Sequence, residues 1–126
     1  MLHANKSAKI LLVDDDLEVA EVLELMLRKL GHQVMAVNSG KEALAAFSSG
    51  DYDLVITDLY MPDLSGDEVA RAIKEAKAGV PVLLITGWGL QLGSSEMGVD
   101  GIIAKPFTKD TLCQQINNVL TVRKKE

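Results

Sequence analysis

The chain has 126 residues, 48% of them hydrophobic and 25% charged, and these shares are typical of a single soluble globular domain. Thirteen Lys and Arg against eighteen Asp and Glu give a net charge of -5, which argues against non-specific nucleic-acid binding. The one cysteine cannot form an intramolecular disulfide, and no apolar run is as long as a signal peptide or membrane span requires. We therefore expect a cytoplasmic protein, one domain over residues 1–126 with its core at about 8–121.

Short aliphatic runs alternate with longer amphipathic stretches along the chain. The runs have the length and composition of strands that are covered on both faces, and they comprise Lys9–Val13, Gln33–Val37, Asp53–Thr57, Pro81–Thr86 and Gly101–Ala104. Five β–α units in this order predict a parallel sheet with helices on both faces. The expected fold is an α/β, flavodoxin-like (βα)5 doubly wound sandwich with strand order 2-1-3-4-5. Ligands bind such sheets at the carboxyl ends of the strands, at the switch point between strands 1 and 3.

Helix signals fill the intervening segments. The first predicted helix runs from about Asp16 to Leu30, with Gly31 as its C-terminal cap. Ser39 and Ser65, each followed by Glu three residues later, match the capping-box pattern at the next two helix starts. The last helix is predicted to begin near Thr108 or Lys109. Side chains predicted to face the core from these helices are Val19, Val22, Leu23, Met26, Leu27, Leu30, Val69, Ile73, Ala76, Leu112, Ile116, Val119 and Leu120.

Charged and polar residues lie at the carboxyl ends of four of the predicted strands. Asp14, Asp15 and Asp16 follow the first strand and Asp58 the third, whereas Thr86 ends the fourth strand and Lys105 follows the fifth. Carboxylates about 4 Å apart repel by about 4 kcal/mol at an effective dielectric near 20, so such a cluster calls for a cation. Oxygen ligands suit Mg²⁺. With a lysine and a threonine beside it, the cluster predicts phosphoryl transfer, in which an aspartate can serve as the nucleophile.

At these residues the chain resembles the receiver domains of bacterial two-component response regulators, and it is similar to the chemotaxis-type single-domain receivers. The resemblance covers about residues 8–120 and depends on motifs that occur in order. These are Lys9–Asp16 (KILLVDDD), Asp53–Gly66 (DLVITDLYMPDLSG), Pro81–Gly87 (PVLLITG) and Gly101–Phe107 (GIIAKPF).

The resemblance implies that Asp58 accepts a phosphoryl group from a phosphohistidine of a sensor histidine kinase or phosphotransfer protein, after which the domain changes conformation and signals to an output partner. Mg²⁺ is then held by Asp14, Asp15, Asp58 and the backbone carbonyl of Tyr60, while Thr86 and Lys105 contact the phosphoryl group. It further implies a cis Lys105–Pro106 peptide. Asp16 matches no ligand position and is expected to cap the first helix. The chain acts as a phosphoacceptor that catalyses only its own phosphorylation and dephosphorylation, with no nucleic-acid or membrane partner.

The sequence departs from the family pattern between Thr86 and Lys105. The position three before the lysine is commonly aromatic and takes part in the conformational switch, but here it is Ile102. The segment between is short and, before the last strand, contains Gly87, Gly89, Gly93 and Gly98. Glycine disfavours helix, so we expect a short or partly melted fourth helix. Our hypothesis is that Trp88 and this glycine-rich segment replace the aromatic switch.

Two other functions stay open. The pattern Asp14-x-Asp16 after an apolar strand also resembles haloacid-dehalogenase-type phosphatases, in which the first aspartate is the nucleophile. That reading leaves Asp58 without a role, and it is distinguished by whether Asp14 or Asp58 becomes phosphorylated. Alternatively, the chain is a purely structural interaction module, which takes phosphate without responding or takes none. The sequence does not show the kinase, the output, or whether the domain stands alone or belongs to a larger hybrid protein.

Overall fold

The computed structural model of the chain describes residues 7–87 and 98–124, and side chains up to residue 120. Its elements in chain order are β1 (Lys9–Val13), α1 (Leu17–Lys29), β2 (Gln33–Val37), α2 (Gly40–Ser49), β3 (Leu54–Asp58), α3 (Gly66–Ala76), β4 (Val82–Thr86), β5 (Gly101–Ala104) and α5 (Lys109–Lys124). The strands form one parallel sheet in the order β2-β1-β3-β4-β5. The predicted winding is therefore confirmed.

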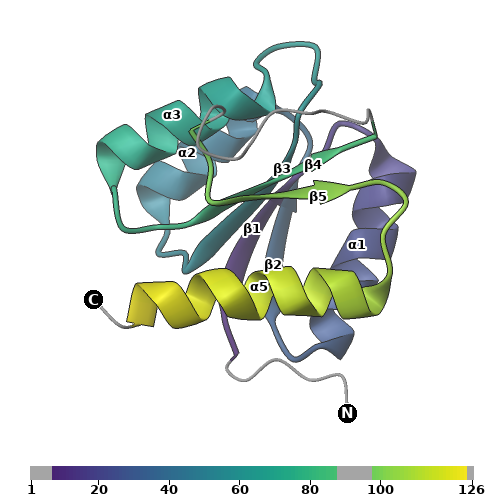
Figure 1. Cartoon of the computed structure of the whole chain (residues 1–126). Coiled ribbons are helices and arrows are strands. Elements are labelled where there is room, and N and C mark those ends of the chain that lie inside the picture. Colours follow the sequence, from purple (N-terminus) through teal and green to yellow (C-terminus); the bar gives the residue numbers. More distant parts are fainter. Residues whose placement is uncertain (1–6, 88–97, 125–126) are drawn as a thin grey trace.

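Helices cover both faces of this sheet (Figure 1). The helices α1 and α5 pack on one face, where Leu23, Leu27 and Ile116 meet the strand residues Ile10 and Leu12. On the other face α2 and α3 bury residues against Leu11 and Val13. Because neighbouring strand residues point to opposite faces, the aliphatic runs supply both cores at once. This explains why they show no alternation with polar residues.

Two of the predicted core positions are wrong. Val22 is 56% exposed, although it falls within the apolar stripe expected for the first helix. Ala76, at the end of α3, is also exposed, and Ala70 is buried in its place. A side chain's burial depends on which arc of its helix faces the sheet, and helical spacing alone does not define the width of that arc.

Strand and helix boundaries follow local hydrogen bonding. β3 starts one residue later than predicted and ends one later, since Asp58 pairs with Ile85 of β4. Asp53 lies outside the strand, where its carboxylate accepts a hydrogen bond from the Lys9 amide at 2.9 Å. β4 begins at Val82 rather than at Pro81, which has no amide hydrogen to donate to a neighbouring strand.

The turn after α1 shows why Gly31 ends the helix. Gly31 has φ +100°, a left-handed conformation that favours glycine. Its amide donates to the Arg28 carbonyl, and the next amide, of His32, donates to the Leu27 carbonyl; this pair of bonds is a Schellman motif. The His32 side chain is buried and accepts a hydrogen bond from the Ala8 amide through Nδ1 at 3.0 Å. The α1–β2 turn is thereby joined to the start of β1.

Among the described helices, none is long and apolar enough to cross a membrane. The prediction of a short or melted fourth helix, and the hypothesis on Trp88, concern residues 88–97 and fall outside the described residues.

Candidate functional site

The carboxyl ends of β1 and β3 bring three aspartates together. One carboxylate oxygen from each of Asp14, Asp15 and Asp58 lies within 4.8 Å of the others. β1 and β3 are neighbours in the sheet, so the ends of both strands lie at the same edge, at the switch point that the sequence predicted. The three carboxylates therefore form one cluster, although Asp58 is more than forty residues from the other two.

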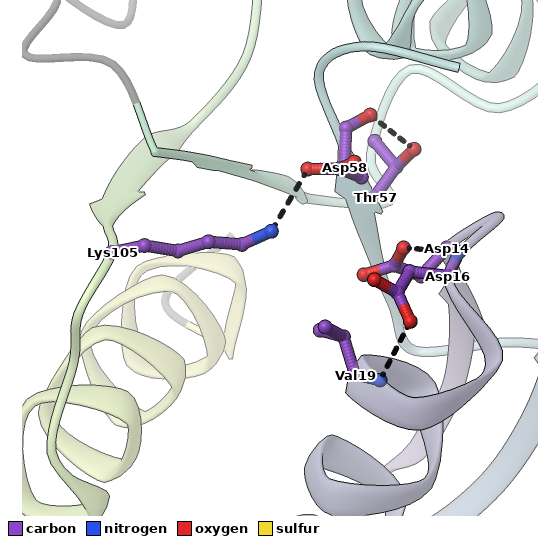
Figure 2. Close-up of polar contacts among 6 residues, drawn as sticks. All are labelled: Asp14, Asp16, Val19, Thr57, Asp58 and Lys105. Atoms are coloured by element: carbon purple, nitrogen blue, oxygen red, sulfur yellow. Dashed lines mark hydrogen bonds and ion pairs between the residues drawn. The ribbon is translucent and has the colours of Figure 1, made fainter. Parts of the chain in front are cut away.

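The lysine reaches this cluster from the end of β5. Lys105 Nζ lies 3.5 Å from Asp58 Oδ1, and Figure 2 shows its side chain extended from the chain after β5 toward Asp58. The Lys105–Pro106 peptide is cis, as the resemblance implied. The Lys105 amide also donates to the Thr86 carbonyl at 2.8 Å, which places the ends of β4 and β5 side by side.

Asp14 is the deepest member of the cluster. It is 1% exposed, and its Oδ1 accepts a hydrogen bond from the Asp16 amide at 2.9 Å. Its other oxygen, Oδ2, is buried and has no hydrogen-bond partner among the described residues. Burial raises the pKa of Asp14 to about 6; the charges of Asp58 and Asp15 also raise it, whereas the Asp16 amide and Lys105 lower it.

Asp58 lies nearer the surface than Asp14, with its side chain 15% exposed. Burial raises its pKa above the ordinary range, and Lys105 opposes this shift both through its charge and through a hydrogen bond. The Asp58 carbonyl accepts a hydrogen bond from the buried hydroxyl of Thr57 at 3.0 Å (Figure 2). Of Asp14 and Asp58, it is thus the partly exposed Asp58 that an incoming group can reach.

The third acid of the run, Asp16, points away from the cluster. Its Oδ1 accepts a hydrogen bond from the Glu18 amide at 3.0 Å and one from the Val19 amide at 3.3 Å, which Figure 2 shows. Asp16 is therefore the N-cap of α1, as predicted. A cap of this kind satisfies amides that the first turn of a helix leaves free.

Thr86 and Tyr60 lie at the same edge of the sheet. Thr86 is 2% exposed and ends β4, one residue beyond Ile85, the residue that pairs with Asp58. Tyr60 lies two residues after Asp58 with its side chain in solvent, 57% exposed. Ile102 of β5 is half-buried and packs against the core on the α2 and α3 face.

The residues present fit a hard divalent cation. The three ligand groups offer only oxygen, which Mg²⁺ prefers. A buried carboxylate oxygen without a hydrogen-bond partner is unusual in a native structure, and a cation in the cluster would satisfy Asp14 Oδ2. Two neighbours of the cluster were not predicted: Thr57, and Asn38, whose Nδ2 lies 3.5 Å from the Asp14 carbonyl oxygen. Thr57 ends its predicted strand and Asn38 follows another, but nothing in the local spacing links either side chain to the cluster.

Comparison with known proteins agrees with this site. The response regulator receiver domain family matches residues 10–117. Among curated proteins, the cell cycle transcriptional regulator CtrA of Caulobacter vibrioides is 34% identical over 121 residues, covering 89% of this chain and 50% of that protein. The cell cycle response regulator CtrA of Brucella ovis is 33% identical over 115 residues, with the same coverage. The chain thus spans about half the length of these relatives.

Two solved structures show the same architecture. A response regulator receiver domain protein from Clostridium thermocellum has a TM-score of 0.86 and 32% identity, covering 93% of this chain and 97% of that one. The response regulator TrrA of Thermotoga maritima, solved in complex with Mg²⁺-BeF, has a TM-score of 0.82 and 35% identity, covering 88% and 97%. The chain belongs to the response regulator receiver domains, the phosphoacceptor signalling domains of two-component systems.

Proposed function

We propose that Asp58 of this chain accepts a phosphoryl group from the phosphohistidine of a sensor histidine kinase or phosphotransfer protein. The observation that carries the proposal is the cluster of Asp14, Asp15 and Asp58 oxygens within 4.8 Å, with the Lys105 ammonium 3.5 Å from Asp58. In this step an Asp58 carboxylate oxygen bonds to phosphorus while the bond between phosphorus and the imidazole nitrogen breaks. The product is an acyl phosphate on Asp58, and the imidazole nitrogen keeps the electron pair of the broken bond.

Mg²⁺ in this site is held by Asp14, Asp15, Asp58 and the backbone carbonyl of Tyr60, and when bound it supplies positive charge for the phosphoryl oxygens. Asp14 supports this assignment because one of its carboxylate oxygens lies in the cluster and its buried Oδ2 has no hydrogen-bond partner among the described residues. Lys105 binds a phosphoryl oxygen as a point charge, a role that lysine commonly has toward phosphate. The Thr86 hydroxyl donates a hydrogen bond to the same group.

Asp58 is favoured over Asp14 as the nucleophile by its surroundings. Asp14 is buried and uses one oxygen for the Asp16 amide, whereas Asp58 is partly exposed beside Lys105. The phosphatase-like alternative requires the buried residue to react. It also leaves the partly exposed Asp58 and its lysine without a function.

The wider roles of the chain are also part of this proposal. Residues 1–126 act as one domain that accepts phosphate, changes conformation and signals to an output partner, without binding nucleic acid itself. One sheet with a core on each face supports the single domain, and the net charge of -5 supports the lack of nucleic-acid binding. The Caulobacter relative, twice as long, is named a transcriptional regulator.

The test is labelling by acetyl phosphate, read by intact mass, in the wild-type chain and the Asp58→Asn variant with and without Mg²⁺. We expect a phosphoryl adduct that requires both Mg²⁺ and Asp58. Labelling that persists in Asp58→Asn would move the nucleophile toward Asp14. Failure of both acetyl phosphate and a cognate phosphohistidine donor to label the wild-type chain would contradict the proposal and favour a purely structural interaction module.

A further inference from the structure

The loop between β3 and α3 carries the proposed metal ligand Tyr60, and it is tied to α2 by a carboxylate. Asp63 lies in the middle of this loop. Its Oδ1 accepts a hydrogen bond from the Gly40 amide at 3.1 Å, and its Oδ2 accepts one from the Lys41 amide at 2.9 Å. Both amides belong to the first turn of α2, where a helix cannot pair its own amide groups. The carboxylate of one element therefore caps the helix of another.

The α2 helix already has a cap of its own. Ser39 Oγ accepts a hydrogen bond from the Glu42 amide at 3.1 Å. Glu42 in turn accepts from the Asn38 amide at 2.9 Å, one residue before the position that a standard capping box uses. Asp63 adds to this local cap. Its distinct effect is on its own loop, which it fastens to the start of α2.

Side-chain packing also holds the β3–α3 loop close to the start of α2. Leu64, next to Asp63, packs against the core on the α2 and α3 face. A Cβ added to Gly40 would lie 2.6 Å from Leu64 Cβ, so only a glycine at this position lets the loop approach the helix. The end of the loop is closed by the Gly66 amide, which donates to the Leu59 carbonyl at 2.7 Å. The helices α2 and α3 lie together on one face of the sheet, beside this loop (Figure 1).

The residues just before α2 also contact the backbone of Asp14. Asn38 Nδ2 lies 3.5 Å from the Asp14 carbonyl oxygen, and the Asp14 amide donates to the Val37 carbonyl at 3.1 Å. Val37 and Asn38 thus contact the Asp14 backbone, and the Gly40 and Lys41 amides bind the loop after Asp58. These four residues support the two strand ends that supply the carboxylates, whereas Ser39 between them bonds within its own helix.

We propose that Asp63 is a positioning residue of the metal site: by capping α2 from the β3–α3 loop, it holds the Tyr60 carbonyl and Asp58 in place relative to Asp14. This inference rests on the proposed function, because it takes Tyr60 and the three aspartates as the ligands of Mg²⁺. Asp63 itself does not bind the ion. Asp63 lies three residues after Tyr60. It affects the affinity for Mg²⁺ by fixing the conformation of the loop that carries the Tyr60 carbonyl.

The test measures the Kd of Mg²⁺ alone by titration calorimetry, and unfolding in urea without the metal. Asp63→Ala is expected to weaken Mg²⁺ binding about tenfold, the lower end of the loss typical for residues that support metal ligands. Asp63→Asn keeps one accepting oxygen and is expected to show a smaller loss. The matched control is Ser39→Ala, which removes a cap from the same helix end without touching the loop. It is expected to unfold more easily yet bind Mg²⁺ as the wild type does.

A second control tests whether the loss of any carboxylate near this loop weakens Mg²⁺ binding, or only the loss of the one that contacts α2. Asp67→Asn removes a carboxylate from the start of α3, just after the same loop, and should leave the Kd unchanged. The inference is overturned if Asp63→Ala binds Mg²⁺ as the wild type does, or if Ser39→Ala or Asp67→Asn weakens binding equally. Should Asp63→Ala fail to fold, wild-type affinity in Asp63→Asn overturns it. If the wild-type chain itself binds no Mg²⁺, the proposed metal site is wrong; if it binds and only the Asp63 effect is missing, the proposed function stands.

Discussion

Asp14 shows how a single buried carboxylate affects stability before any ligand binds. Its pKa is raised to about 6 from an ordinary 3.8, chiefly by burial, so the folded chain disfavours its ionised form. The stability that the protonated form contributes is present below pH 3.8 and is lost as the pH rises through about 6. At neutral pH without a cation, the charged Asp14 therefore destabilises the fold.

Asp14→Asn is expected to stabilise the metal-free chain at pH 7. Each pKa unit corresponds to about 1.4 kcal/mol, so the gain is about 2 to 3 kcal/mol. The asparagine oxygen can still accept the bond from the Asp16 amide, and its uncharged side chain avoids the cost of a buried charge. Urea unfolding at pH 7 and pH 4 measures the effect, which should be near zero at pH 4. Asp15→Asn, at the exposed neighbour, serves as the control; equal stabilisation by both would contradict the burial argument.

Gly66 is a residue where backbone contact leaves no space for a side chain. A Cβ built on it would lie 2.3 Å from the Asp58 carbonyl oxygen and 3.0 Å from Leu59 Cα. Both are backbone atoms, of Asp58 and of the residue after it, so they cannot move without moving the proposed phosphoacceptor. The glycine is required because α3 starts directly against the end of β3.

Gly66→Ala is expected to lower the free energy of unfolding by about 3 kcal/mol, at the upper end of the usual cost of overpacking. Gly79→Ala is the matched control, since a Cβ there meets nothing within 4 Å, and it should change stability by less than about 1 kcal/mol. Thermal unfolding of both variants provides the comparison. Similar melting temperatures for the two would show that the contact at Asp58 is easily relieved.

At the scale of elements, the neighbouring residues Asp15 and Asp16 at the start of α1 have different roles. Asp16 caps the helix through the amides of Glu18 and Val19, whereas Asp15 directs an oxygen into the cluster with Asp14 and Asp58. One helix start thus combines a structural carboxylate with proposed metal ligands.

Asp16→Ala is expected to cost about 1 kcal/mol of stability, the usual value of an N-cap, and to leave Mg²⁺-dependent labelling by acetyl phosphate intact. Asp15→Ala should do the reverse, with little effect on stability and a marked loss of labelling. Chemical denaturation and intact mass, run on both variants, test this division. Loss of labelling in Asp16→Ala, in a chain that remains folded, would contradict it.

At the scale of the whole molecule, the proposed metal site joins elements from distant parts of the chain. A ligand that binds only the folded state stabilises it, so Mg²⁺ is expected to raise the melting temperature. The gain is about 2.7 kcal/mol at a concentration one hundred times its Kd. This stabilisation by Mg²⁺ should decrease as the pH falls below about 6, the pKa of Asp14, because protons then compete with the cation for the Asp14 carboxylate.

Scanning calorimetry with and without Mg²⁺ between pH 5 and 8 measures this dependence, with a monovalent salt of equal ionic strength as the control for screening. The Asp58→Asn variant should gain less than the wild type. A stabilisation that is independent of pH, or equal in the two proteins, would show that the cation acts elsewhere.

Much of the architecture could be predicted from the sequence because it depends on local patterns. Aliphatic runs separated by helix signals led to five parallel strands, and the rule for carboxyl ends led to Asp14, Asp58, Thr86 and Lys105 at one edge. Helix ends were also predictable where the cap lies within a few residues, as at Asp16 and Gly31. The capping box at Ser65 is present, whereas Glu42 bonds to Asn38 instead of Ser39.

Contacts between residues that are far apart in the chain depend on how the elements pack and could not be predicted from local patterns. Asp63 is 23 residues from Gly40 and looks like an ordinary loop residue after Pro62 until the fold brings it to α2. His32 and Ala8 meet only because β1 and β2 pair, and Val22 is exposed because the sheet covers a narrower arc of α1 than helical spacing predicts. The local residue pattern specifies which elements form and where charged residues lie along them. Burial, and with it the pKa of Asp14 and the loop contact of Asp63, depends on which surfaces the packed elements place against one another.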